Sequence, residues 1–239
     1  MRVVISIGGS ILAPDLDAER VAGHAEVIES LSDEGCEIGI VVGGGGVARE
    51  YIDTARELGA NEVQLDQLGI DVTRINARLL ISALEGDAKP TPATDYDTAG
   101  DALRHGDISV MGGITPGQTT DAVAAAFAEY IDADLLVYAT STDGVYDADP
   151  NVDPEAIKYT TMSPPELVDL IVPMSRDAGA SAPVDILAAK LIERSGMRTV
   201  VLDGSDPSSI ESAVLRGDHN GTDIIPHGSS EPAAWVETE

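Results

Sequence analysis

Aromatic residues, cysteine and lysine are all scarce in this sequence. Phe, Trp and Tyr make up 3% of its 239 residues, and there is one cysteine, Cys36. With so few aromatic rings, the core must consist mainly of aliphatic side chains, as it does between helices and a sheet. A single cysteine excludes an intramolecular disulfide and a cysteine-cluster zinc site, and it favours a reducing, cytoplasmic compartment.

The N-terminus has no long hydrophobic run. Its apolar stretch, Val3 to Ile7, is too short for a signal-peptide core or a membrane-spanning helix. We therefore expect a buried strand there, and a protein without a membrane partner.

Positive charge is the third scarcity. The chain has 14 basic and 42 acidic residues, a net charge of -28 and a pI near 4.1, and its only lysines are Lys89, Lys158 and Lys190. At about 1 M salt the screening length falls to about 3 Å, so such a surface suits a halophilic cytoplasm. An ordinary acidic mesophilic enzyme is the alternative. In either case nucleic acid is not an expected partner.

Apolar runs that end in glycine recur along the chain, and helical patterns follow them. This order is typical of an α/β fold with a parallel sheet. The expected strands are Val3 to Ile7, Ile38 to Val42, Ile108 to Met111, Asp134 to Ala139 and Arg198 to Leu202. The expected helices are Asp17 to Asp33, Val47 to Leu58, Asp66 to Glu85, Thr119 to Ile131 and Val184 to Ser195. Residues 143–165 are expected to form a long excursion loop.

Three of the expected strands carry glycines at their carboxyl ends, in Gly8 to Ser10, Gly43 to Gly46 and Gly112 to Thr120. Backbone N–H groups at such turns and at helix N-termini favour anions, and ligands of open parallel sheets bind beyond this edge. The three turns together predict one phosphate-binding crevice.

Other chemistries have weaker support. Gly43 to Ala48 fits G-x-G-x-x-A, but two helical segments follow it where a dinucleotide-binding unit needs a second strand. No G-x-x-x-x-G-K-[ST] motif occurs, and the four histidines lack metal-ligand spacing. Near the glycines, Arg49 is a candidate phosphate clamp or a surface residue, and Asp66 is a candidate ribose ligand or a helix cap.

Five segments together resemble the archaeal type of UMP kinase, a branch of the amino-acid kinases. They are GGSIL at 8–12, VVGGGGVAREYI at 41–52, MGGITPGQTTDAVAA at 111–125, TSTDGVYDADP at 140–150 and GDHNGT at 217–222. The resemblance covers residues 1–226. It implies a three-layer αβα sandwich with a mainly parallel sheet, Mg²⁺-dependent chemistry with ATP and UMP, and a homohexamer built from dimers.

The resemblance also implies which residues bind each substrate. One domain spans 1–226, with 1–133 on the UMP side and 134–226 on the ATP side, followed by an acidic, disordered tail at 227–239. The implied UMP site is Gly44, Asp66, Ile114, Thr115, Pro116, Gly117, Gln118, Thr119 and Thr120. The implied ATP site is Gly9, Ser10, Gly45, Arg49, Thr140, Tyr146 and Asp149. The alternative for Tyr146 is a role in packing, and the alternative for Asp149 is a role as a turn residue.

Ser6 departs from the pattern, because many relatives carry a lysine two residues before the glycines. Arg49, Asp185 and Lys190 are the weak catalytic candidates left, with Mg²⁺ and the backbone amides of Gly8 to Ser10 supplying charge stabilisation. Two alternatives stay open. One is another amino-acid kinase acting on carbamate, an acyl amino acid or isopentenyl phosphate, and the other is a nucleotide-binding regulatory or storage protein without catalysis.

Overall fold

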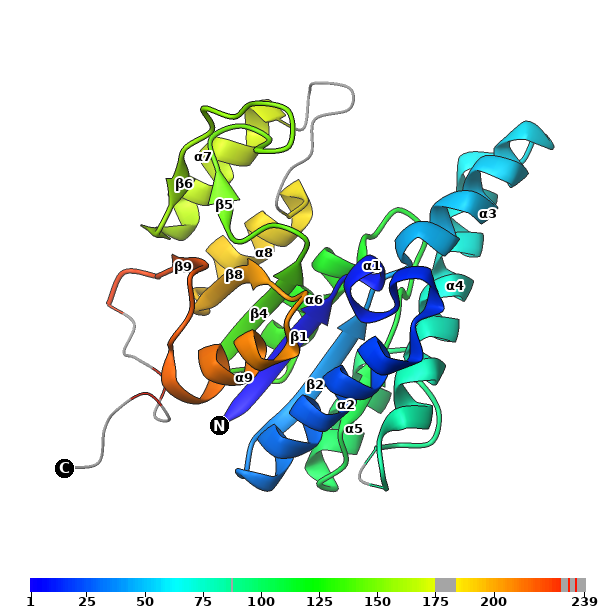
Figure 1. Ribbon diagram of the computed structural model, residues 1–239, viewed down its shortest axis with the longest axis horizontal. Coiled ribbons are helices and arrows are strands. Elements are labelled where there is room, and N and C mark those ends of the chain that lie inside the picture. Colours follow the sequence, from blue (N-terminus) through cyan, green and yellow to red (C-terminus); the bar gives the residue numbers. More distant parts are fainter. Residues whose placement is uncertain (87, 175–183, 229–231, 233–234, 236–239) are drawn as a thin grey trace.

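A seven-stranded sheet forms the centre of the molecule (Figure 1). The computed structural model describes residues 1–86, 88–174, 184–228, 232 and 235. The sheet order is β3-β2-β1-β4-β8-β9-β7, and every neighbouring pair is parallel except β8 with β9. The strands are β1 Arg2–Ile7, β2 Glu37–Val42, β3 Ser109–Met111, β4 Leu135–Thr140, β7 Thr161–Met162, β8 Thr199–Asp203 and β9 Thr222–Ile224.

Helices cover both faces of this sheet (Figure 1). One face packs against α5 Tyr96–Arg104, α6 Thr120–Tyr130, α7 Pro164–Met174 and α8 Ile186–Ser195. The other packs against α2 Ala18–Asp33, α4 Glu62–Ala83 and α9 Pro207–Arg216, with α3 Gly45–Glu57 lying along α4. This arrangement confirms the expected three-layer αβα sandwich.

Alternation along β1 shows how the sequence divides between the layers. Val3, Ile5 and Ile7 pack with α2, α4 and α9, whereas Val4 points to the opposite face with α6. Successive strand residues point to opposite faces, so Ser6 also lies on the α6 side. It is 4% exposed there, and a lysine at this position would be close to the start of α6.

The five expected strands and five expected helices are all present, with shifted ends. The largest shift is at α4, where the prediction of a helix start at Asp66 is wrong. The helix begins four residues earlier because Asn61 and Gln64 form a capping box, in which each side chain accepts from the other's backbone N–H. Asp66 consequently lies one turn inside α4, on the side of the helix that meets the glycine turns.

Short elements were not predicted. The segment 143–165, expected as a loop, contains an antiparallel hairpin of β5 Val145–Tyr146 and β6 Lys158–Tyr159, then β7. Strands of two residues carry no period that a sequence can reveal. The structure also adds the four-residue helix α1 Gly9–Leu12, together with α5, α7, α9 and β9.

Trp235 lies in the segment that the sequence predicts to be a disordered tail, and its side chain contacts the folded domain. Its indole Nε1 donates to the Val214 carbonyl at 2.9 Å, and the Arg198 guanidinium lies 4.6 Å from the ring centroid. A Cβ on Gly217 would come within 2.8 Å of the same ring. The side chain therefore covers the end of α9 and the start of β8.

Replacing Trp235 by Ala should lower the free energy of unfolding by about 2 kcal/mol, through lost packing and the lost cation–π contact. Urea unfolding in molar KCl, followed by circular dichroism, measures the change. Trp235→Phe is the matched control, because it keeps a ring but loses the N–H donor, and it should cost about 1 kcal/mol. An unchanged unfolding midpoint in the Ala variant would show that the ring is not seated in solution.

Candidate active site

The glycine turns after β1 and β2 touch each other through their backbones. A Cβ on Gly9 would lie 2.4 Å from the Gly45 nitrogen and 2.5 Å from the Gly43 carbonyl oxygen. Gly45 has a φ of +65°, and its own Cβ would lie 2.6 Å from the Gly9 carbonyl carbon. No residue with a side chain fits either place without backbone movement. The predicted convergence of these two turns is therefore realised by direct contact.

Two buried residues of α4 hold the second and third glycine turns. The Asn76 amide donates to the carbonyls of Gly43 at 2.9 Å and Gly44 at 3.2 Å. The Thr73 hydroxyl accepts from the Gly113 N–H at 2.7 Å and donates to the Ile70 carbonyl. Sequence reasoning missed both residues. The available signal was a polar side chain on the apolar face of a predicted helix, which needs a buried partner.

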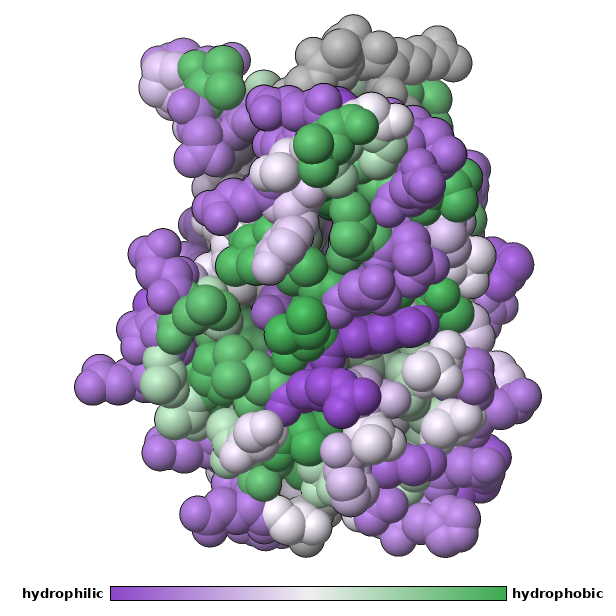
Figure 2. All heavy atoms as spheres, turned by 90° about the vertical axis from the view of Figure 1, so that its right-hand side faces the viewer, coloured by the Kyte–Doolittle hydropathy of each residue, from purple (hydrophilic) through white to green (hydrophobic). Residues whose placement is uncertain are grey.

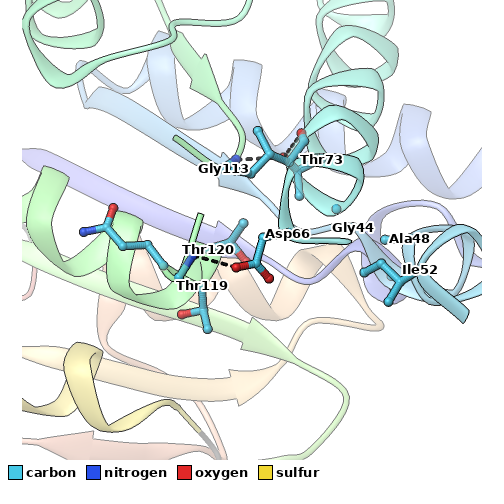
Figure 3. Close-up of a pocket in the computed structure, with 13 residues that line it drawn as sticks. Gly44, Ala48, Ile52, Asp66, Thr73, Gly113, Thr119 and Thr120 are labelled. Carbon is cyan, nitrogen blue, oxygen red and sulfur yellow. Dashed lines mark hydrogen bonds between the residues drawn. The ribbon is translucent and has the colours of Figure 1, made fainter. Parts of the chain in front are cut away.

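A cavity of about 420 Å³ lies between these turns and α4 (Figure 3). Six of the residues expected at the UMP site line it, namely Gly44, Asp66, Gly117, Gln118, Thr119 and Thr120. Its remaining lining residues are Gly45, Ala48, Ile52, Gly69, Ile70, Thr73 and Gly113. The expected residues Ile114, Thr115 and Pro116 are not among those that line it. The cavity thus has one carboxylate, an apolar wall from α3 and α4, and the amides of two glycine turns.

Asp66 of α4 forms a hydrogen bond with the third glycine turn, Gly112 to Thr120. One of its carboxylate oxygens accepts from the Gly117 N–H at 2.8 Å, as the dashed line near Asp66 in Figure 3 shows. Gly117 has a φ of +82°, which glycine adopts without strain. The other carboxylate oxygen has no such partner among the described residues, so it is available to accept from a ligand hydroxyl.

A pair of acids lies next to the cavity, at the N-termini of α6 and α8. Asp121 accepts from the Ser6 hydroxyl at 3.5 Å, and Asp185 accepts from the hydroxyl of the cavity residue Thr119. Asp185 also caps α8 through the N–H groups of Leu187 and Ala188. The candidate Asp185 is therefore one hydrogen bond away from the cavity. Asp121, near the start of the expected helix Thr119 to Ile131, was not among the catalytic candidates.

The neighbouring carboxylate affects the ionisation of Asp121. Burial, and after it the negative charge of Asp185, raise the pKa of Asp121 to about 7, while the hydrogen bond from Ser6 opposes the shift. Burial and the same two acids also raise the pKa of the Tyr138 phenol, whose hydroxyl donates to the Asp121 carbonyl at 2.8 Å. The acid pair consequently sits where added positive charge is favourable.

Three of the expected ATP residues, Thr140, Tyr146 and Asp149, lie on the β4 and β5 side of the glycine contact, whereas Gly45 lines the cavity and Arg49 follows the cavity residue Ala48. Thr140 ends β4, and its hydroxyl donates to the Thr142 carbonyl at 2.9 Å. Tyr146 lies in β5 and donates to Asp143 at 2.5 Å. Asp149 accepts from the Asn151 backbone N–H at 2.9 Å, which is the turn role considered for it.

Arg49 and Lys190, two catalytic candidates, both lie at the surface. Arg49 is exposed on α3, one residue beyond the cavity residue Ala48, and no hydrogen bond or ion pair joins it to another described residue. Lys190 donates to Glu193 of its own helix at 2.9 Å and is 52% exposed. Arg49 thus has the freedom to reach a phosphate, whereas Lys190 already has a local partner.

A twisted, mostly parallel sheet with glycine turns and helix N-termini at its carboxyl edge defines an α/β protein that binds phosphorylated ligands. The profile of the amino acid kinase family matches residues 1–203. The uridylate kinase of Halorubrum lacusprofundi is 72% identical over 99% of this chain and 98% of that protein. The uridylate kinase of Haloquadratum walsbyi is also 72% identical, over the full length of both chains.

A solved structure agrees with these relatives. The crystal structure of the uridylate kinase from Archaeoglobus fulgidus superposes with a TM-score of 0.83 at 45% identity, covering 94% of this chain and 100% of that one. The chain therefore belongs to the amino acid kinase family, and within that family to the uridylate kinases.

The raised pKa of Asp121 predicts how stability depends on pH. Between about pH 4 and pH 7 the folded protein keeps a proton that the unfolded chain releases, so stability falls as pH rises through that window. Asp121→Asn removes this loss. Thermal unfolding of both proteins in molar KCl, from about pH 4 to pH 8, should show the variant gaining stability relative to the wild type as pH rises.

The exposed residue Asp169 on α7 provides the control for this comparison. Asp169→Asn removes the same charge far from the Ser6 contact, and its unfolding curve should run parallel to that of the wild type at every pH. Parallel curves for Asp121→Asn as well would contradict the raised pKa.

Proposed function

We propose that this protein transfers the γ-phosphoryl group of ATP to UMP, giving ADP and UDP for pyrimidine nucleotide synthesis. The observation that carries the proposal is the cavity between α4 and the glycine turns, which combines one carboxylate with converging backbone amides. A nucleoside monophosphate offers the complementary groups, since it has ribose hydroxyls at one end and a phosphate at the other. The relatives named uridylate kinases favour uracil as the base.

UMP would lie along α4 in this proposal. Its ribose hydroxyls would donate to the free oxygen of Asp66, and its phosphate would accept from the amides at Gly44 and at the start of α6. The loop Ile114 to Thr120 would close over the base. Ile114, Thr115 and Pro116, which do not line the cavity, would come into contact through movement of this loop.

ATP would lie on the β4 and β5 side of the glycine contact. Gly9, Ser10 and Gly45 would bind its phosphates through their backbone N–H groups, and Arg49 would supply paired donors from α3. Thr140, Tyr146 and Asp149 would contact the nucleoside. The γ-phosphate would then face the acceptor across Gly9 and Gly45, whose backbones are already in contact.

Charge stabilisation, rather than proton abstraction, is the task of this site. The acceptor phosphate has a second pKa of about 6 and is mostly dianionic at neutral pH, so it needs no strong base. Ser6 is uncharged, and its hydroxyl donates to the Asp121 carboxylate at 3.5 Å. The backbone amides and Arg49 would therefore stabilise most of the charge that develops on the protein side.

Mg²⁺ would accompany ATP, and the residues present fit that role. No group of three or more His, Cys, Asp or Glu able to hold a metal occurs in the described part of the chain. Mg²⁺ in kinases is bound by substrate phosphates, water and one or two carboxylates, and Asp121 and Asp185 are the carboxylates next to the cavity. When bound, the ion neutralises charge on the phosphates.

The outer face of α3 and α4 suits assembly with further copies of this chain. Figure 2 shows apolar side chains among the polar ones on this side of the molecule. The exposed apolar residues there are Tyr51, Leu58, Val63, Ile75 and Leu79. We propose a cytoplasmic homohexamer in which this face is buried. A monomer in sedimentation equilibrium in molar KCl would contradict it.

No helix in the described residues is long and apolar enough to cross a membrane.

The test of the proposed function is ADP release from MgATP with UMP, CMP, AMP, GMP or no acceptor, in molar KCl and in dilute buffer. We expect rapid release with UMP, loss of that release when Mg²⁺ is chelated, and the higher rate in molar KCl. Release with carbamate, an acyl amino acid or isopentenyl phosphate, but not with UMP, would contradict the proposal. Binding of UMP and ATP without any ADP release would indicate a non-catalytic nucleotide-binding protein.

Asp66→Asn tests the division of the site. The amide can still accept from the Gly117 N–H, but it lacks the charge that favours ribose hydroxyls, so the KM for UMP should rise by about tenfold or more. The KM for ATP should change little. Asp71→Asn, an exposed change on the same helix, is the control. Equal rises in both KM values would contradict the placement of UMP against α4.

A further inference from the structure

Lys158 is the one lysine whose amino group is held by two segments distant in sequence. Its Nζ donates to the Asp143 carboxylate at 2.8 Å and to the Asn220 carbonyl at 2.8 Å. The side chain is 25% exposed, compared with 52% for Lys190, which pairs within its own helix. In a chain that uses lysine at only three positions, this placement of one of them needs an explanation.

The surrounding backbone is built closely around the lysine. Gly144 has a φ of +146°, and a Cβ there would lie 2.6 Å from the Thr222 hydroxyl and 3.1 Å from the Lys158 Cδ. The Thr222 hydroxyl accepts from the Val145 N–H at 2.8 Å and donates to the Tyr159 carbonyl. The hairpin of β5 and β6 is thus hydrogen-bonded to β9 of the main sheet through Thr222. Lys158 adds a second connection, to the Asn220 carbonyl just before β9.

Asp143 links Lys158 to Tyr146 by accepting a hydrogen bond from each of them. One carboxylate oxygen accepts from Lys158, and the other accepts from the Tyr146 hydroxyl at 2.5 Å. Both bonds lower the pKa of Asp143, that of Lys158 most strongly, so the carboxylate stays ionised and remains a strong acceptor. Asp143 and Asn220 also line a cavity of about 250 Å³ beside the carboxyl end of β8.

We propose that Lys158 is a positioning residue for the ATP half of the site. By joining Asp143 to the Asn220 carbonyl, it fixes the hairpin so that the Tyr146 ring is presented toward the nucleotide. The inference rests on the proposed function, because it takes Tyr146 as an ATP contact. Lys158 does not line the cavity assigned to UMP, so its effect should be confined to ATP.

Calorimetric titration with a non-hydrolysable MgATP analogue, and separately with UMP, tests the proposal in molar KCl. Lys158→Met keeps the length of the stem and removes the charge, and it should weaken binding of the ATP analogue by about tenfold while leaving UMP binding within about twofold. Lys158→Arg should restore most of the lost affinity, because a guanidinium can bridge the same two acceptors. Lys89→Met, which removes the same charge elsewhere, should match the wild type.

Each other outcome is decisive. Equal weakening of both ligands would show a general structural role and overturn the proposal, as would no weakening at all. If Lys158→Met does not fold, Tyr146→Phe breaks the link at its far end and leaves Lys158 paired with Asp143. Selective loss of affinity for the ATP analogue in that variant supports the proposal, and unchanged affinity overturns it.

The same titrations separate this inference from the proposed function. A wild-type protein that binds neither ligand would contradict both. A wild-type protein that binds both ligands but releases no ADP would contradict only the proposed function, because the effect of Lys158 on ATP affinity needs no turnover.

Discussion

The backbone contact between the glycine turns of β1 and β2 is the constraint on which the rest of the site depends. These strands are parallel neighbours, and a Cβ on Gly9 would lie within 2.5 Å of Gly43, Gly44 and Gly45. This contact places the start of α1 against the start of α3. It also divides the carboxyl edge of the sheet into a half beside α4 and a half beside β4 and the β5–β6 hairpin. Buried polar residues of α4, Asn76 and Thr73, hold the turns from behind.

Electrostatics sets the second constraint, because a chain of net charge -28 is proposed to bind two anionic substrates. In the proposed site, few positively charged side chains would contact the substrates. Backbone amides at the glycine turns add nothing to the surface charge, and fixed amides of this kind stabilise an anion without rearrangement. Two further acids next to the cavity, Asp121 and Asp185, accept hydrogen bonds from the hydroxyl groups of Ser6 and Thr119. Molar salt, at which the screening length is about 3 Å, would shield the substrates from the rest of the acidic surface.

The sequence predicted β1, β2, β3, β4 and β8 of the main sheet and the helices α2, α3, α4, α6 and α8, because their apolar periods extend over several turns or a full buried strand. It did not predict α5, α7 and α9, although α7 is as long as α6. The glycine turns were recovered because glycine has a conformational meaning of its own. Elements held by single tertiary contacts were not recovered. The β5–β6 hairpin depends on contacts with Thr222 and Asn220, which are distant from it in sequence, and Trp235 is placed by Arg198 and Val214.

In the site, too, residues with a local sequence signal were predicted, and residues whose role depends on tertiary contacts were not. Asp66 was identified as a site residue, but its place inside α4 required the capping box at Asn61, and its bond to Gly117 required the fold. Thr73 and Asn76 hold the glycine turns from buried positions, and Asp121 accepts a hydrogen bond from Ser6. Which polar residue faces which turn depends on the packing of α4 and α6, and one sequence does not specify it.

The central claim is that the two halves of the carboxyl edge bind different nucleotides at the same time. Calorimetric titration of UMP into the protein, with and without a saturating non-hydrolysable MgATP analogue in molar KCl, tests it most directly. One UMP per chain, bound with similar or higher affinity when the analogue is present, is the predicted result. Loss of UMP binding in the presence of the analogue would show a single shared site and contradict the account.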